Sequence, residues 1–123
     1  PLFTIMGPGC RSVTRIHTDA TDMAVGVWND GRIGTFRGIR AGQQGYGSTV
    51  FGTKGIVPGG SFEGYEPLIV EIIRFFKTGQ PPVSEAETLE IFAFMEAADE
   101  SKRQGGSPVT LESVMQKAQQ IVD

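Results

Sequence analysis

Residues 23–40 carry the sequence MAVGVWNDGRIGTFRGIR, which predicts a β-hairpin. An apolar run over residues 23–28 leads into Asn29-Asp30-Gly31, and residues 32–40 form the return strand. Gly31 favours the turn because glycine tolerates the positive φ that tight hairpin turns require. We take this hairpin as the centre of the fold.

The segments around the hairpin predict further strands, because they are rich in β-branched and aromatic residues and are separated by glycines. We expect these strands at residues 2–6, 12–18, 48–51 and 56–57. Side chains alternate between the two faces of a strand. Apolar residues therefore point to both faces of each strand of the hairpin. Val25 and Trp28 lie on opposite faces of the first strand, and Ile33 and Phe36 lie on opposite faces of the return strand.

Helices are predicted in the second half, where apolar residues recur three and four positions apart. The first covers residues 65–76 and ends at Gly79, which two prolines follow. Ser84 and Glu87 have the spacing of a capping box and open the second helix. Its apolar residues are Leu89, Ile91, Phe92, Met95 and Ala98.

Thr110 is placed to cap a third helix over residues 111–121. Its apolar stripe consists of Val114, Met115, Ala118 and Ile121. Strands followed by helices predict an α+β fold, a mostly antiparallel sheet with helices packed on one face. We expect one domain over residues 1–123, with a sheet-rich part (1–60) and a helix-rich part (61–123).

Composition and charge narrow the class of protein. The chain has 123 residues, of which 39% are hydrophobic and 20% charged, which is typical of a globular domain. Residues 1–60 carry a net charge of +3 and residues 61–123 a net charge of −6. The isoelectric point of about 5.1 argues against a nucleic-acid-binding domain. No apolar run approaches a membrane span, and we expect a cytoplasmic protein with no membrane contact.

Few residues offer catalytic or metal-binding chemistry. Cys10 and His17 are the only cysteine and the only histidine, so neither a disulfide nor a cysteine–histidine metal cage is expected. Arg15 and His17 share one strand face and could line a polar substrate cleft. Alternatively, they pair with Asp19, Asp22 or a neighbouring strand. Tyr46 could stack on a sugar, although such an aromatic residue can equally belong to a core or an interface.

The helical half resembles the C-terminal domain of the Gfo/Idh/MocA oxidoreductases, the family of glucose–fructose oxidoreductase and inositol dehydrogenase. The stretches that carry this resemblance are GYEPL (64–68), FFKTGQPPV (75–83), ETLEIFAFMEAA (87–98), SKRQGG (101–106) and PVTL (108–111). In the first half, DGR (30–32) and FGTKG (51–55) are similar to the sheet strands of that family.

The resemblance implies a fragment of a longer, NAD- or NADP-dependent enzyme that acts on a sugar or cyclitol. Members of the family pair a Rossmann domain with this α+β domain. The Rossmann fingerprint, the Glu-Lys-Pro lysine and the Asp–His pair four residues apart are not found in this sequence, since Val13 stands four residues before His17. We therefore expect no catalytic residue, no cofactor site and no metal site here, and we expect substrate contacts at Arg15, His17 and Tyr46.

Two further expectations follow from the start of the chain and from its sheet. The chain begins with Pro1, so we expect it to start inside a longer gene product whose Rossmann domain is missing. Helices can cover only one sheet face, and the other apolar face predicts a homodimer through that open face. The alternatives are a stand-alone binding or interaction module with the same fold, and a small enzyme built around Arg15 and His17.

Overall fold

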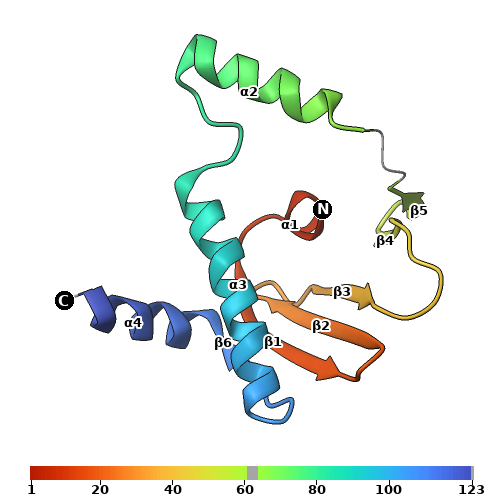
Figure 1. Ribbon diagram of the computed structural model, residues 1–123, viewed down its shortest axis with the longest axis vertical. Coiled ribbons are helices and arrows are strands. Elements are labelled where there is room, and N and C mark those ends of the chain that lie inside the picture. Colours follow the sequence, from red (N-terminus) through yellow and green to blue (C-terminus); the bar gives the residue numbers. More distant parts are fainter. Residues whose placement is uncertain (61–63, 123) are drawn as a thin grey trace. The chain divides into compact units, whose positions relative to one another are not determined.

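The computed structural model describes residues 1–60 and 64–122 of the chain (Figure 1). Residues 61–63, at the expected boundary between the two parts, and residue 123 lie outside the described residues. The elements are α1 (Leu2–Met6), β1 (Cys10–His17), β2 (Thr21–Trp28), β3 (Ile33–Ile39), β4 (Ser48–Gly52), β5 (Gly55–Gly59), α2 (Glu66–Thr78), α3 (Glu85–Arg103), β6 (Val109–Thr110) and α4 (Leu111–Val122). The fold is α+β, as the sequence predicts.

The chain forms two compact units. The first unit consists of Pro1–Gly42 and Glu85–Asp123, and the second unit consists of Gln43–Ser84. The parts that composition distinguishes, residues 1–60 and 61–123, therefore each contribute to both units.

The sheet of the first unit has four antiparallel strands in the order β3-β2-β1-β6. The predicted hairpin joins β2 to β3, and Gly31 has a φ of 87° at its turn. The Trp28 amide donates to the Arg32 carbonyl at 2.8 Å, which closes the hairpin. The expected return strand is thus confirmed as β3.

Residues 2–6 form helix α1, so the prediction of a strand there was wrong. The Gly7 amide donates to the Phe3 carbonyl at 2.7 Å, which is the spacing of an α-helix. A short apolar run has no clear period, and tertiary contacts decide its conformation. Here Phe3 is buried, and Leu2 and Met6 pack beside it against the core.

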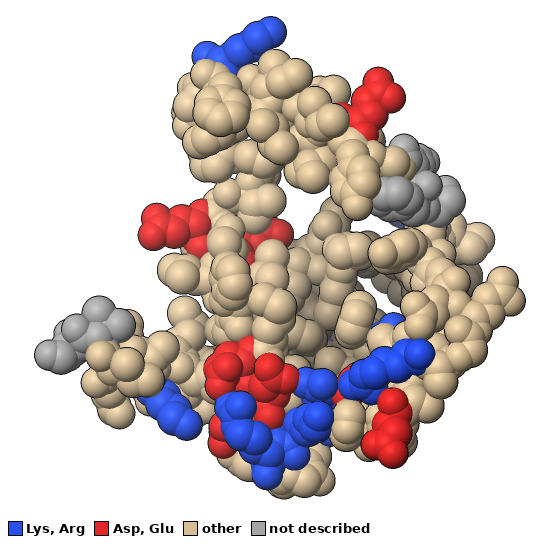
Figure 2. Space-filling view, viewed as in Figure 1, with Lys and Arg blue, Asp and Glu red and all other residues tan. Residues whose placement is uncertain are grey.

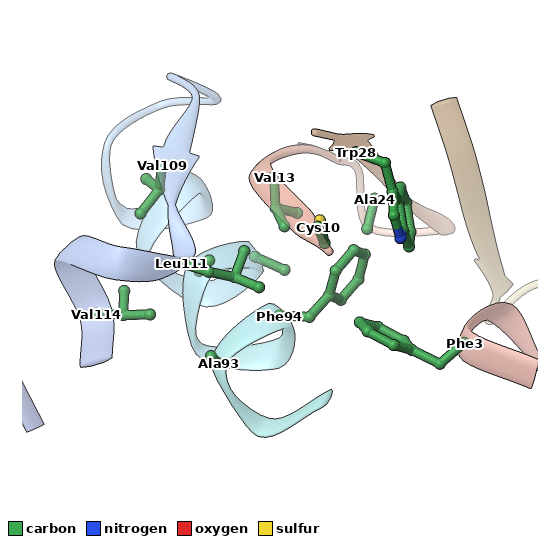
Figure 3. Packing of buried hydrophobic residues seen from close by; sticks show 12 residues of the cluster. Phe3, Cys10, Val13, Ala24, Trp28, Ala93, Phe94, Val109, Leu111 and Val114 are labelled. Atoms are coloured by element: carbon green, nitrogen blue, oxygen red, sulfur yellow. The ribbon is translucent and has the colours of Figure 1, made fainter. Parts of the chain in front are cut away.

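The core lies between the sheet and the helices of the first unit (Figure 3). The Trp28 ring meets Phe3 and Phe94 at centroid distances of 5.8 and 6.5 Å. A Cβ on Gly26 would stand 2.8 Å from ring atoms of both Phe94 and Trp28. The two rings can therefore pack against β2 only because this position has no side chain. The buried apolar residues are Phe3, Cys10, Val13, Ala24, Trp28, Ala93, Phe94, Ala97, Ala98, Val109, Leu111 and Val114.

Helix α3 turns small residues toward the sheet, which the apolar spacing did not predict. Its buried residues are Ala93, Phe94, Ala97, Ala98 and Ser101. Of the apolar residues expected on this face, Ala98 is buried, whereas Leu89, Phe92 and Met95 are exposed. The small side chains let the helix approach β1 closely, and Phe94 then fills the remaining space beside Trp28.

Two polar side chains of α3 attach the helix to β1. Glu90 Oε1 accepts hydrogen bonds from the amides of Gly9 and Cys10, at 2.6 and 2.7 Å. Eleven residues further along the helix, Ser101 Oγ accepts a hydrogen bond from the Arg15 amide at 2.9 Å. These contacts hold α3 in place along β1. They also satisfy the amides of Gly9, Cys10 and Arg15, which do not pair with the neighbouring strands β2 and β6.

Helix α4 begins as predicted, because Thr110 Oγ1 accepts a hydrogen bond from the Ser113 amide at 3.2 Å. In its expected stripe, Val114 is buried, whereas Met115 and Ile121 are exposed.

The second unit contains the antiparallel β4–β5 hairpin and helix α2. Helix α2 ends where the sequence predicts, since Gly79 has a φ of 69° and its amide donates to the Phe75 carbonyl at 2.7 Å. No described side chain of α2 is buried. Among the helices that the structure describes, none combines the length and apolar character needed to cross a membrane.

Candidate functional site

The candidate polar residues lie on the helix-facing side of the sheet, where β1 and β2 extend beyond the core. Val13, Arg15 and His17 alternate onto this side, and Val13 is fully buried. Asp22 of β2 stands directly opposite His17 in the antiparallel register. The strand alternation therefore brings Arg15, His17 and Asp22 onto one surface, as the sequence predicts for the first two.

Asp22 is the centre of a charged group that we call the Asp22 cluster, made of Arg15, His17, Asp22, Arg40 and Asp99. Asp22 Oδ1 lies 2.9 Å from Arg15 Nε and 2.7 Å from His17 Nδ1. Its second oxygen pairs with Arg40, and Arg15 also pairs with Asp99 of α3. Acidic and basic side chains gather around the C-terminal end of α3 (Figure 2).

The position of His17 decides its charge. Partial burial, followed by the positive charges of Lys102, Arg40 and Arg15, lowers the pKa of His17 below its ordinary value. The lowered pKa favours the neutral imidazole. In that form a proton on Nδ1 is donated to the Asp22 carboxylate, and Nε2 is an acceptor.

A groove of about 380 Å³ opens beside the Asp22 cluster. Its floor comes from β2 and β3, one wall comes from α3, and the cluster closes one end. Phe36 is 56% exposed and Met95 is 48% exposed, so both present apolar surface to a ligand. The lining residues are Arg15, Asp22, Ala24, Phe36, Gly38, Ile39, Arg40, Phe94, Met95, Ala98 and Asp99.

The three expected site residues have different positions. Arg15 lines the groove, and His17 contacts Asp22 at its end. Tyr46 belongs to the second unit and is 81% exposed. Sequence reasoning named Asp22 only as a possible partner of Arg15 and His17, and it did not propose Arg40, Asp99 or Phe36 as site residues.

The sequence contains a usable signal for Arg40 but none for Asp99. Arg40 follows Phe36 and Gly38 on the same strand alternation, so its face could be predicted. Asp99 lies 84 residues from Arg15 in the sequence, and no local pattern connects the two.

The chemistry within the groove is that of paired charges. In the described ranges, no three His, Cys, Asp or Glu side chains are grouped as a metal site. Burial and then the nearby Glu90 raise the pKa of the Cys10 thiol to about 11, so it is not a thiolate at neutral pH. Guanidinium and carboxylate groups beside an aromatic ring can bind and orient a polar molecule.

The opposite side of the same sheet is a second candidate surface, which we call the open face. It consists of Ser12, Thr14, Ile16, Thr21, Met23, Val25, Val27, Ile33, Thr35, Arg37 and Ile39. Ile16 and Ile33 are 59% and 62% exposed, and Val25 lies half-buried between them. No carboxylate belongs to this face, and Arg37 is its one formal charge. Such a surface is typical of an interface.

Comparison of the chain with protein-family models, curated proteins and solved structures finds no match in any of the three. The resemblance noted in the sequence therefore stays a prediction. Any function must be supported by the groove, the Asp22 cluster and the open face.

Proposed function

We propose that this chain is the substrate-binding and oligomerisation domain of an NAD(P)-dependent oxidoreductase of the Gfo/Idh/MocA type. In this proposal the parent enzyme acts on a sugar or cyclitol, and a Rossmann domain in the same polypeptide holds the NAD or NADP. The observation that carries the proposal is the sheet with two different faces. Helices cover one face beside a polar groove, and the other face is apolar and open.

The groove supports the substrate-binding part of this proposal. Arg15 and His17 lie at its polar end, and Phe36 offers an exposed ring on which the apolar face of a sugar can stack. A cytoplasmic location is part of the proposal. The domain would orient the substrate, while the hydride transfer would take place at the cofactor.

A second candidate is a stand-alone binding or interaction module with the same fold. The Asp22 cluster favours this candidate, because Arg15 is already paired with two carboxylates, Asp22 and Asp99. The open face would then be the functional surface by itself. The sequence upstream of Pro1 in the gene distinguishes the two, since the first candidate requires a dinucleotide-binding fingerprint there.

The isolated chain is expected not to bind NADH. Both sheets of the described residues are antiparallel, whereas a dinucleotide fold places the pyrophosphate at a helix that follows a parallel strand. The measurement is a titration of NADH fluorescence, with a known dehydrogenase as the positive control. Saturable binding at micromolar NADH would contradict the assignment of cofactor binding to a separate domain.

The isolated chain is expected to form a homodimer through the open face. A stable interface of this apolar kind buries roughly 2,000 Å² or more in total. Size-exclusion chromatography with light scattering should therefore give twice the 13.2 kDa mass of the monomer. Val25→Glu should give the monomer, because it buries a carboxylate at the centre of the contact.

Val83→Glu is the matched control for this dimer. Val83 is 42% exposed and belongs to the second unit, so the same substitution there should leave the dimer intact. Circular dichroism confirms that both variants are folded. Two results would refute an interface at the open face. One is that the unsubstituted chain is a monomer at high micromolar concentration, and the other is that the two variants have equal masses.

A further inference from the structure

Strand β3 forms one edge of the four-stranded sheet, and among the described strands only β2 pairs with it. The Arg40 amide donates to the Ala20 carbonyl, and the Arg32 carbonyl accepts from the Trp28 amide, each at 2.8 Å. Even-numbered residues of β3 therefore direct their backbone groups toward β2. The backbone groups of odd-numbered residues point outward, since donors and acceptors alternate along a strand. An edge of this kind is a template for another strand.

The sequence of β3 reads nearly the same in both directions. It is Ile33-Gly34-Thr35-Phe36-Arg37-Gly38-Ile39, and only Thr35 and Arg37 break the symmetry about Phe36. We propose that β3 pairs antiparallel with β3 of a second copy of this chain, about a two-fold axis at Phe36. The contact would extend the sheet in its own plane. It is thus a second interface beside the stacked open faces. Because a single pair of short strands is weakly stable by itself, it joins copies only at concentrations above those at which the open-face dimer forms, and it does not depend on the proposed enzymatic function.

The register about Phe36 satisfies both the backbone and the side chains. Each outward-pointing residue faces another one, so the strands can exchange amide and carbonyl groups as an antiparallel pair requires. Phe36 stands opposite its own copy, and Arg37 stands opposite Thr35. An axis at Arg37 would instead place two like charges opposite each other, which is unfavourable. The axis at Phe36 also joins apolar residues that are exposed in a single copy, Ile33 to Ile39.

The glycines of β3 leave room for the same register. A Cβ on Gly34 would stand 3.0 Å from Leu2 Cδ1 and 3.1 Å from Met6 Cγ, because α1 covers this glycine. In the proposed pair Gly34 lies opposite Gly38 of the second copy. No side chain of the opposing residue therefore approaches α1 at that point.

A cysteine at the axis tests the pairing directly. Residues opposite each other in a non-hydrogen-bonded pair have Cα atoms about 4.5 Å apart, within the range of a disulfide. Phe36→Cys should cross-link under mild oxidation. Arg37→Cys should lose most of this cross-linking, because its copies lie two pairs apart, beyond the roughly 7 Å Cα separation that a disulfide allows. Cys10 is buried and does not compete. Equal rates for the two variants would overturn the proposal.

Proline at Thr35 gives the second test, because its outward amide makes no bond to β2. Hydrogen exchange of the full chain should show protection of the Thr35 and Arg37 amides that rises with protein concentration. Thr35→Pro should abolish the concentration dependence at Arg37, while Thr35→Ala should keep it. Protection that does not depend on concentration would overturn the proposal, since the edge would then be paired within one copy. Exchange that stays fast at high concentration would overturn it as well.

Discussion

Replacing Trp28 with alanine is expected to destabilise the first unit by about 3–5 kcal/mol. Its side chain is 1% exposed, and its ring contacts Phe3 and Phe94. The indole Nε1 also donates to the Gly7 carbonyl at 2.8 Å, so the substitution leaves this carbonyl without its donor. A domain of this size has a total stability of about 5–15 kcal/mol, so the substitution would remove between about a fifth and all of it.

Urea unfolding followed by circular dichroism measures this loss, since Trp28 is the only tryptophan and its fluorescence disappears with it. Trp28→Phe keeps part of the ring packing and should lose less. Tyr46→Ala is the control for loss of an exposed aromatic residue and should change stability by less than about 0.5 kcal/mol. An unchanged urea midpoint for Trp28→Ala would show that the indole does not hold the core together.

The second large effect is expected for Asp22→Ala, at about 2–3 kcal/mol of lost stability. Removal of one partner costs about 3–5 kcal/mol in a buried ion pair and up to about 1 kcal/mol in an exposed one. Asp22 and Arg15 lie between these limits, with side chains that are 15% and 18% exposed. The substitution also deprives His17 and Arg40 of the carboxylate that they share with Arg15.

Asp30→Ala is the matched control for this prediction. Asp30 Oδ2 lies 2.7 Å from Arg32 Nε, and Oδ1 accepts a hydrogen bond from the Arg32 amide at 3.1 Å, but the two side chains are 55% and 50% exposed. Its loss should therefore cost less than about 1 kcal/mol. Chemical unfolding of both variants gives the comparison. Equal losses at Asp22 and Asp30 would mean that the Asp22 cluster behaves as an ordinary solvated surface pair.

How far the fold could be predicted from the sequence depends on the range of the interactions that determine each element. The β2–β3 hairpin was predictable because Asn29-Asp30-Gly31 fixes its turn locally. Helix α1 was not, since a run of four apolar residues and Thr4 fits either a strand or a helix until Phe3 meets the core. The inward face of α3 was predicted only in part, since Ala98 is buried and Ile91 packs against the core. Leu89 and Phe92 are exposed, because the choice of alanines at this face depends on the space that Trp28 leaves.

The candidate site also combines features that local sequence determines with features that only distant contacts determine. Strand alternation was enough to place Arg15 and His17 on one face. The sequence could not show that Arg15 pairs with Asp99, because only the packing of α3 on β1 brings these two residues together. The groove is likewise a product of two elements that are distant in sequence.

The split of the first unit into Pro1–Gly42 and Glu85–Asp123 has a consequence for the order of events during synthesis. Strands β1 to β3 leave the ribosome early, but their cover arrives only with α3 and with Val114 of α4. At 5–20 residues per second, the interval between Gly42 and Val114 lasts roughly 4–14 s. Contacts such as Glu90 to Gly9, 81 residues apart, can form only once α3 has been synthesised. The nascent sheet therefore exposes both apolar faces for seconds, a period in which a chaperone would be its natural partner.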